Sequence, residues 1–446
     1  TKGWDAAELA NEIDRLAGHD RGPLPMEFDA LPVEFDELSA RATDSPLPHA
    51  AGTSYSIETT AAEWVGAETD VAQTRGAENG AAQWAGCVPA GEETAGEETF
   101  GDHEATPRLR VIDAAGNRAG EAVRVIEDYA RFVLDDRHLA GECKSLRHAL
   151  TAALSVFPAA QRHAARETRA DVGTTLSLET ERHRAGLRAV VGANFKRLEQ
   201  ALRSLEEYSK PTSAAAAAAL EQMRYRAYTL ERAVDITADS LERLAGARLY
   251  VLVDGRGSDE GLAHWVDTLV AAGVDMIQLR DKELADRELL ARARVVRRQT
   301  RGTKTLFIMN DRPDIARLAG ADGVHVGQEE LSVKEARTIV GPDALVGRST
   351  HGLEQAREAV LDGANYIGVG PVFPSTTKQF AEFPGLELLR AVSAEIRLPA
   401  FAIGGIGTGN IAEVRACGFS RVAVSGSVSE SAAPADVVRE LKRRLV

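Results

Sequence analysis

Cysteine, aromatic residues and long apolar runs are scarce in this chain of 446 residues, in which aromatic residues make up only 5%. The three cysteines, Cys87, Cys143 and Cys417, lie far apart without CxxC spacing, which favours reduced thiols in a cytoplasmic protein over a disulfide framework. No apolar run approaches about 18 residues, so we expect no membrane span, and we expect no signal peptide. A basic stripe is also missing, which argues against nucleic-acid binding.

The negative charge of the chain is confined to its N-terminal part. Residues 1–107 contain 22 Asp/Glu and 5 Lys/Arg, a net charge of −17, whereas the whole chain carries −14. The same part is rich in Ala, Gly, Glu, Thr and Pro, and its low hydrophobicity cannot offset the entropy lost on ordering. We therefore predict that residues 1–106 are a disordered acidic segment. An acidic tail that binds a partner is the alternative.

Residues 107–245 have the periodicity of helices. Apolar side chains recur at helical spacing over residues Ala119–Val133 and Leu198–Tyr208, and a third run, Ala214–Leu244, follows the candidate helix cap Ser213. We predict that this part is an all-α domain.

Two of the predicted helices share a signature. The segments EAVRVIEDY (Glu121–Tyr129) and QALRSLEEY (Gln200–Tyr208) align without gaps. In each segment an arginine, Arg124 or Arg203, precedes a glutamate by three residues and so lies on the same face of the helix. Such arginines could flank a phosphorylated ligand or form salt bridges within their own helices, and the spacing alone does not decide between the two.

Short apolar runs alternate with helical stretches over residues 246–446. This alternation is typical of a parallel sheet, and eight repeats in about 200 residues predict a closed (β/α)₈ TIM barrel. A doubly wound open sheet is the alternative, although no GxGxxG opens a helix here. The fold class is therefore α/β, with the all-α domain and the acidic segment ahead of the barrel. The predicted strands are Leu249–Asp254, Asp275–Asp281, Thr305–Asp311, Gly323–Gly327, Leu345–Thr350, Tyr366–Phe373, Pro399–Ile406 and Arg421–Val428.

The stretch Tyr366–Lys378 combines a predicted strand with a polar loop. Its sequence is YIGVGPVFPSTTK, in which Pro374 ends the apolar part and three hydroxyl residues and a lysine follow at once. Hydroxyls and an ammonium group at the end of a strand suit a phosphorylated ligand, since each can donate to an anionic oxygen. A Ser/Thr turn with a solvated lysine is the alternative.

Polar side chains also follow the other predicted strands. In a barrel these strand ends meet at one mouth, so we expect Arg280, Lys282 and Lys378 to converge with Asp311 and Glu330. Cations beside carboxylates suggest a polyanion bridged by Mg²⁺, which favours a few carboxylates plus phosphate oxygens. The segments Gly404-Gly405 and Ser425-Gly426 fit a monophosphate cradle of backbone N–H groups. The residues thus predict one diphosphate ligand and one monophosphate ligand, with simple solvation of strand ends as the alternative.

The barrel region resembles the thiamine-phosphate synthase family along its whole length. The matching motifs are QLRDK, MNDRPDIA, GADGVHVGQEEL, YIGVGPVFPSTTK and AIGGI. The resemblance implies an enzyme that joins hydroxymethylpyrimidine diphosphate to thiazole phosphate and releases pyrophosphate. It also implies a magnesium cofactor and small phosphorylated substrates, with no nucleic-acid or membrane partner.

The resemblance implies site residues by position. The pyrimidine diphosphate site is matched by Gln278, Leu279, Arg280, Asp281, Lys282, Asn310, Ser349 and Lys378, of which Arg280, Lys282 and Lys378 stabilise the departing charge. The thiazole phosphate site is matched by Ser375, Thr376, Thr377, Gly405, Val424 and Ser425, and the magnesium ligands by Asp311 and Glu330. The family usually has aspartate where Glu330 stands and threonine where Ser375 stands, and both departures keep the ligand atom type.

The helical region resembles a domain found fused ahead of this synthase, which has been proposed to be a hydroxymethylpyrimidine phosphate kinase. The motifs are RVIDAAGNRAGEAVRVIEDYARF, DVGTT and NFKRLEQALRSLEEY. The resemblance implies ATP as a second substrate, although neither a Walker A motif nor a kinase Gly-rich loop occurs. A non-catalytic dimerisation or regulatory module is the alternative. The candidate ligand residues are Asn117, Arg118, Arg124, Asp171, Thr174, Thr175, Asn194 and Arg203.

Two other functions remain as alternatives for the barrel. The first is a Schiff-base aldolase that uses Lys282 or Lys378, but the clustered charges disfavour the neutral amine that such chemistry needs. The second is a relative of thiazole tautomerase that has kept only the thiazole phosphate site. The presence of Arg280, Asp311 and both lysines argues against it. The oligomeric state, a homo-oligomer included, is left open by the sequence.

Overall fold

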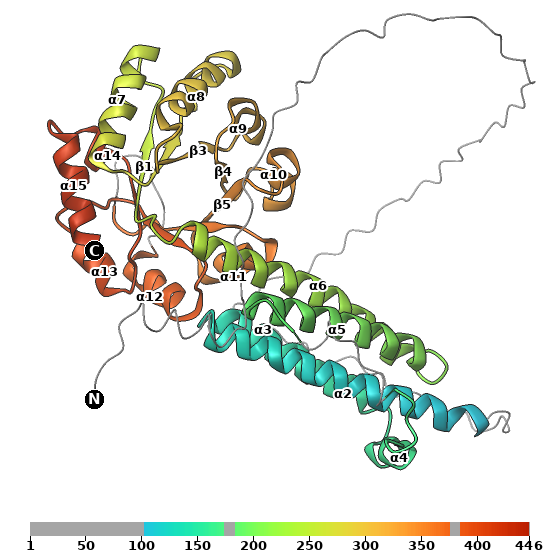
Figure 1. Cartoon of the computed structure of the whole chain (residues 1–446). Coiled ribbons are helices and arrows are strands. Elements are labelled where there is room, and N and C mark those ends of the chain that lie inside the picture. The colour runs from blue at the N-terminus through green and yellow to red at the C-terminus, as the bar shows by residue number, and fades with distance from the viewer. Residues whose placement is uncertain (1–101, 174–182, 375–383, 446) are drawn as a thin grey trace, which may run out of the picture. The chain divides into compact units, whose positions relative to one another are not determined.

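The computed structural model describes residues 102–173, 183–374 and 384–445, and all of these belong to one unit (Figure 1). The predicted acidic segment, residues 1–106, lies outside the described residues except for residues 102–106, which are helical in α2 and not disordered as predicted. No helix in the described ranges is long and apolar enough to span a membrane.

The first part of the described chain is helical, as predicted. Its helices are α2 (Asp102–Phe132), α3 (Arg137–Leu154), α4 (Ala159–Ala165), α5 (Leu187–Ser209) and α6 (Ala214–Arg243). Helix α6 begins where the sequence predicted a cap, because the side chain of Ser213 accepts a hydrogen bond from the N–H of Ala216. Helices α2, α3, α5 and α6 pack around a common core in which the apolar faces of α2 and α5 meet.

Two side chains that the periodicity assigned to this helical core lie outside it. Val133 is 45% exposed because α2 ends at Phe132, and Tyr208 is 46% exposed in the last turn of α5. The remaining apolar positions of both runs, from Ala119 to Ala130 and from Leu198 to Leu205, are buried as predicted.

The second part is a closed barrel of eight parallel strands in sequence order, with β8 paired to β1 (Figure 1). This closure confirms the TIM barrel and excludes the open sheet. The strands are β1 (Leu249–Val253), β2 (Met276–Leu279), β3 (Leu306–Asn310), β4 (Gly323–Val326), β5 (Leu345–Thr350), β6 (Tyr366–Val369), β7 (Ala400–Ile403) and β8 (Val422–Val424). The helices are α7 (Asp259–Ala272), α8 (Asp286–Thr300), α9 (Pro313–Ala319), α10 (Val333–Val340), α11 (Leu353–Asp362), α12 (Gly385–Glu395), α13 (Ile411–Ala416), α14 (Gly426–Ser429) and α15 (Pro434–Leu445).

Strands β6, β7 and β8 are shorter than the sequence predicted, and β7 ends at Ile403 because Gly404 and Gly405 follow with positive φ. Strand β6 ends at Val369, because Gly370 and Pro371 follow and a proline has no N–H for the strand ladder. Strand β8 ends at Val424, and the predicted remainder of that run turns into the short helix α14.

Near the N-terminal ends of its strands, the interior of the barrel is filled by aromatic and aliphatic side chains. The rings of Tyr250, Tyr366 and Phe401 pack edge to face, with centroids 5.4–5.9 Å apart. Leu244, which follows α6, is fully buried in the same cluster. The last residues of the helical part therefore close the base of the barrel.

Further contacts join the helical part to the N-terminal ends of the barrel strands. The amide of Asn365, just before β6, donates to Ser240 Oγ over 3.0 Å, and Arg243 donates to the carbonyl of Asp343 over 2.8 Å. The carboxylate of Asp136 accepts from the N–H of Arg397 over 2.8 Å, and burial raises the pKa of Asp136. The predicted division into 107–245 and 246–446 stays a prediction, and it would separate residues that pack together.

Candidate active site at the mouth of the barrel

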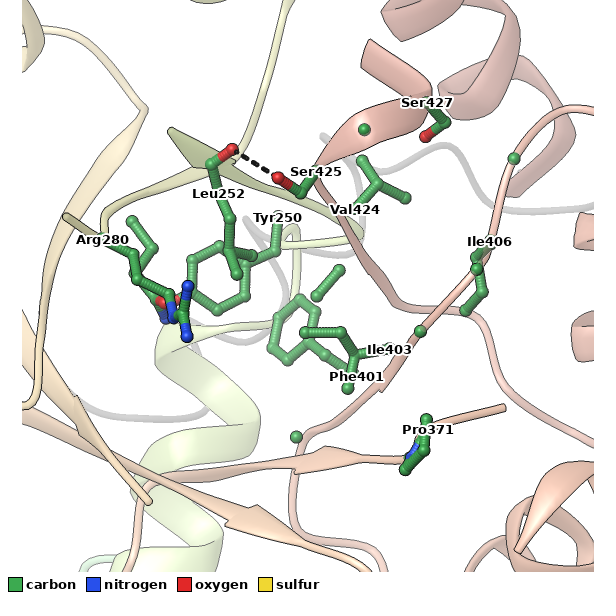
Figure 2. Close-up of a pocket in the computed structure, with 18 of the residues that line it drawn as sticks. Tyr250, Leu252, Arg280, Pro371, Phe401, Ile403, Ile406, Val424, Ser425 and Ser427 are labelled. Atoms are coloured by element: carbon green, nitrogen blue, oxygen red, sulfur yellow. Dashed lines mark hydrogen bonds between the residues drawn. The ribbon is translucent and has the colours of Figure 1, made fainter. Parts of the chain in front are cut away.

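A cavity of about 790 Å³ opens at the C-terminal ends of the strands (Figure 2). Of the predicted residues, the cavity is lined by Gln278, Arg280, Asn310, Ser349, Gly404, Gly405, Val424 and Ser425. Residues from five different strand ends thus share one space. Of the five charged residues that the sequence predicted to converge, Arg280 lines this cavity, while Lys378 lies outside the described residues.

The end of β2 supplies two of these groups. Gln278 points into the barrel and is 3% exposed, and Arg280 follows the strand with its N–H bonded to the carbonyl of Val253 over 2.8 Å. Leu279 has its side chain on the opposite face of the strand, within the hydrophobic core, because side chains alternate along a strand. Leu279 therefore contributes no side chain to the cavity.

The carboxylate of Asp281 holds the loop after β2 in place. It accepts hydrogen bonds from the N–H groups of Gly255, Glu283 and Leu284 over 2.9–3.2 Å. Burial alone would raise the pKa of Asp281, but these donors lower it below its usual value. Asp281 thus positions the loop that carries Arg280.

A chain of buried hydrogen bonds fixes Gln278. Its side-chain amide donates to the hydroxyl of Tyr250 over 2.6 Å, and that hydroxyl shares a hydrogen bond of 3.0 Å with Tyr366. Burial raises the pKa of both phenols, so both are neutral at pH 7. The network leaves Gln278 one orientation at the floor of the cavity.

A second buried pair fixes Ser349. The Nε2 of His325 lies 3.0 Å from Ser349 Oγ, and the imidazole stacks on the ring of Tyr366 at a centroid distance of 5.5 Å. Burial lowers the pKa of His325 to about 4, so the ring is neutral and can hydrogen-bond without charge. Gly347 makes room for it, because a Cβ there would overlap the ring of Tyr366 and crowd His325 Nδ1 at 2.6 Å.

Tyr250 and His325 are site residues that our sequence analysis missed. Both occupy inward-facing positions of strands that are buried on both faces, where no alternation of polar and apolar residues marks them. A signal was available for His325, because it is the one polar residue in the run GVHV of β4.

The predicted acid pair meets a lysine beside this cavity. The Nζ of Lys282 lies 3.7 Å from an oxygen of Asp311 and 3.9 Å from an oxygen of Glu330. The amide of Asn310, which lines the cavity, donates to Asp311 over 2.7 Å. The acid pair is thereby linked to the cavity wall.

Asp311 is held in an unusual environment. Its backbone lies in the left-handed region with φ of 59°, which costs free energy for a residue other than glycine. Burial, and after it the neighbouring charge of Glu330, raises the pKa of Asp311, whereas Lys282 and Asn310 act in the opposite direction. Two carboxylates placed so that they repel each other are a site for a cation.

The carboxylate of Glu330 lies directly beside the Cα of Gly327, in the space that a side chain would fill. A Cβ at Gly327 would overlap Oε2 of Glu330 and lie 3.1 Å from its Cδ. Gly327, which follows β4, therefore leaves room for the Glu330 carboxylate in the position where it lies near Lys282.

The donor set fits magnesium that also binds a substrate. Within the described ranges no third histidine, cysteine or acidic residue joins the two carboxylates in a metal-binding group. Two protein carboxylates, with the remaining positions left for water and phosphate oxygens, is the arrangement that Mg²⁺ favours in phosphate-binding enzymes.

The opposite wall of the cavity contains two glycines that pack closely against the segment after β6. Gly404 and Gly405 have φ of 105° and 62°, and a Cβ on Gly405 would lie 2.6 Å from the carbonyl oxygen of Pro374. Ser425 lies across from them at the end of β8, where its hydroxyl is 3.5 Å from the carbonyl of Leu252 (Figure 2). The cradle for a monophosphate at these residues stays a prediction.

Several predicted residues lie outside the described ranges. They are Ser375, Thr376, Thr377 and Lys378 in the barrel, and Thr174 and Thr175 in the helical part.

The structure does not gather the helical candidates into one site. Arg118 and Asn194 line a separate groove between α2 and α5. Asn117 donates to Asp113 over 3.4 Å, and Asp171 accepts from the N–H of Gly173 over 2.9 Å. These last two candidates therefore make local hydrogen bonds away from that groove.

The duplicated arginines form salt bridges, which is the second of the two interpretations of their spacing. Arg124 lies 3.6 Å from Glu127, and Arg203 donates to Glu206 over 2.8 Å. Both glutamates are buried, and each also pairs with an arginine of the next helix in the chain.

Comparison with known proteins assigns both parts of the chain to families. Residues 249–428 match the family of thiamine monophosphate synthase, and residues 110–233 match the ThiD2 family. The thiamine-phosphate synthase of Rhodopirellula baltica is 44% identical over 335 residues, which cover 73% of this chain and 89% of that protein. The thiamine-phosphate synthase of Synechocystis is 39% identical over 340 residues, which cover 76% and 97%. Among solved structures, the thiamine phosphate pyrophosphorylase of Pyrococcus furiosus is 34% identical with a TM-score of 0.41, covering 45% of this chain and 95% of that one.

Proposed function

This chain belongs to the thiamine-phosphate synthase family, and from that premise we propose that its barrel joins a pyrimidine methyl diphosphate to thiazole phosphate. The products are thiamine phosphate and pyrophosphate. The observation that carries this proposal is one cavity with Arg280 and Asn310 on one side and Gly404 and Gly405 on the other, beside which Asn310 donates to Asp311 of the acid pair. The two buried cysteines, Cys143 and Cys417, are free thiols, which fits a cytoplasmic enzyme.

The reaction requires one bond to form and one to break. The thiazole nitrogen forms a C–N bond with the pyrimidine methylene carbon, while the C–O bond to the diphosphate breaks and its electron pair leaves with the diphosphate. The positive charge that develops on the methylene is shared with the electron-rich pyrimidine ring. No nucleophile from the protein is needed, so the protein orients two substrates and stabilises the leaving group.

Each side chain then has a defined task. Arg280 and Lys282 stabilise the charge that grows on the departing diphosphate, as does Lys378 by its position in the sequence. Asp311 and Glu330 would hold Mg²⁺, which when bound neutralises diphosphate charge and orients that group. Gln278 and Ser349, fixed by Tyr250 and His325, orient the pyrimidine ring by hydrogen bonds.

The test is the substitution Arg280→Ala with preformed diphosphate and thiazole phosphate as substrates. We expect turnover to fall by about 10²-fold or more, because a preorganised donor to the developing charge is lost. Arg294→Ala, on the exposed face of α8, is the matched control and should keep the turnover of the unaltered chain. Equal turnover in both variants would remove Arg280 from the diphosphate site.

We also propose that the helical part makes the diphosphate that the barrel consumes. In this step the γ-phosphoryl group of ATP passes to a phosphate oxygen of hydroxymethylpyrimidine phosphate, which leaves ADP and the diphosphate. Support comes from the match of residues 110–233 to the ThiD2 family, in a chain whose barrel needs such a substrate.

The second proposal is tested on the full chain with hydroxymethylpyrimidine phosphate and thiazole phosphate. We expect thiamine phosphate to form when ATP is added and not without it. If product forms only when preformed diphosphate is supplied, the helical part is a structural or regulatory module and the synthase proposal alone stands.

A further inference from the structure

A second cavity, of about 580 Å³, lies along the contact between α2 and α5. We call it the α2/α5 groove. Its polar residues are Arg118 and Glu121 from α2 and Asn194, Arg197, Gln200 and Ser204 from α5. Its floor includes the buried small side chains of Ala122 and Ala201, so a ligand could approach both helices closely.

The lining of the α2/α5 groove repeats itself. When the two signatures EAVRVIEDY and QALRSLEEY are aligned, Arg118 falls opposite Arg197 and Glu121 opposite Gln200. By the same alignment Ala122 falls opposite Ala201. Each of the two helices therefore contributes the same set of equivalent positions to the lining of the groove.

The repeat extends beyond the groove to the packing of the next helix. Glu127, 5% exposed, accepts from Arg147 of α3 over 3.3 Å, and Glu206, 3% exposed, accepts from Arg224 of α6 over 3.1 Å. The α2–α3 and α5–α6 pairs are thus two copies of one helical hairpin, which meet along the groove.

The two arginines of the groove differ from their neighbours in having no acidic partner. Across the described part of the chain, no carboxylate forms an ion pair with Arg118 or Arg197, whereas Arg124 and Arg203, two turns further along the same helices, are both paired. Arg118 and Arg197 line the same cavity and are exposed, so both guanidinium groups are accessible to an anion from solvent. The single carboxylate of Glu121 does not balance both charges.

We infer that the α2/α5 groove binds the diphosphate group of a small molecule, one phosphate to each arginine. A diphosphate has two equivalent anionic ends, and the groove offers one guanidinium from each copy of the hairpin, a group suited to phosphate oxygens. The choice of a phosphorylated ligand rests on the proposed function of the helical part. Binding is nevertheless measurable apart from phosphoryl transfer.

The experiment uses the full chain carrying Ser204→Cys, which places a thiol in the groove with little change in volume. Alkylation of that thiol by iodoacetamide is followed by peptide mass spectrometry, with inorganic pyrophosphate as the probe at constant ionic strength. We expect pyrophosphate to slow alkylation at least fivefold. The added pair Arg118→Gln and Arg197→Gln should abolish this protection, and the matched pair Arg124→Gln and Arg203→Gln should leave it intact.

The rate of alkylation is measured at a thiol inside the groove. Pyrophosphate that binds only in the barrel would therefore not change it. Alkylation that pyrophosphate does not slow, or protection that survives loss of both groove arginines, would overturn the inference. Protection in a chain that shows no ATP-dependent synthesis would uphold the groove and refute the kinase proposal. ATP-dependent synthesis without protection would uphold the kinase and refute the groove.

Discussion

Leu244 offers a direct test of how the helical part supports the barrel. It follows α6, yet its side chain is fully buried against Tyr250, Tyr366 and Phe401 in the interior of the barrel. The barrel core therefore has a component that the domain division at residue 245 assigns to the helices. We predict that Leu244→Ala destabilises the barrel as strongly as a substitution in one of its own strands.

The magnitude follows from the burial of this side chain. Replacing a fully buried leucine by alanine removes apolar contacts and leaves a cavity between rigid aromatic rings, at a cost of about 2–5 kcal/mol. For a unit of this size each kcal/mol lowers the melting temperature by roughly 2 °C. We expect the urea midpoint and the melting temperature, both followed by circular dichroism, to fall accordingly.

The matched control is Leu187→Ala, the same substitution at a leucine that is 61% exposed at the start of α5. Its effect should stay below about 0.5 kcal/mol. A chain that begins at residue 240 should also be more stable than one that begins at 247, because it keeps both Leu244 and the hydrogen bond from Asn365 to Ser240. A cost below about 1 kcal/mol for Leu244→Ala would show that the base of the barrel is closed without it.

Three further predictions concern the barrel. Asp311→Asn should lower Mg²⁺-dependent turnover by about 10²-fold. Glu330→Asp keeps a carboxylate and should change turnover only slightly. Activity that EDTA leaves untouched would contradict the metal site. Gly327→Ala should raise the Mg²⁺ concentration needed for half-maximal turnover, because its Cβ displaces the carboxylate of Glu330, and an unchanged Mg²⁺ dependence would refute this. Burial raises the pKa of Tyr250 and Tyr366 in the folded chain. Above pH 10 the unfolded chain therefore releases phenolic protons that the folded chain retains. The free energy of unfolding then falls by about 1.4 kcal/mol per pH unit for each phenol. Urea midpoints of Tyr250→Phe measured between pH 9 and 11 should show a shallower decline, and an identical decline would contradict the assignment.

The barrel could be predicted because its strands are short apolar runs bounded by polar loops. Strand β5 was predicted with the bounds it has, Leu345–Thr350, and most other strands end within two residues of their predicted limits. The mouth of the cavity was predictable for the same reason, since parallel strand ends meet there and Arg280 and Asp311 directly follow strands.

The site residues that we did not predict are those whose roles depend on tertiary contacts and not on the local sequence pattern. Tyr250 and His325 act from inward positions of fully buried strands, and the hydrogen bonds they make to Gln278 and Ser349 depend on which strands become neighbours. Likewise, which of Arg118 and Arg124 lines the groove and which forms a salt bridge depends on which face of α2 meets α5. Only tertiary packing separates the groove arginine from the salt-bridged one.

The two proposed steps are placed at opposite ends of the barrel. The helical part meets the barrel at the N-terminal ends of the strands, through Ser240 and Leu244, whereas Gln278 and Arg280 lie at the C-terminal ends. Strands of three to six residues, at about 3.3 Å per residue, separate these ends by roughly 10–20 Å of packed core. No path through the barrel interior joins them, because Tyr250, Tyr366 and Phe401 fill it. A diphosphate made by the proposed kinase would therefore not pass through the barrel interior, and what we expect of the fusion is that it stabilises the base of the barrel through Leu244.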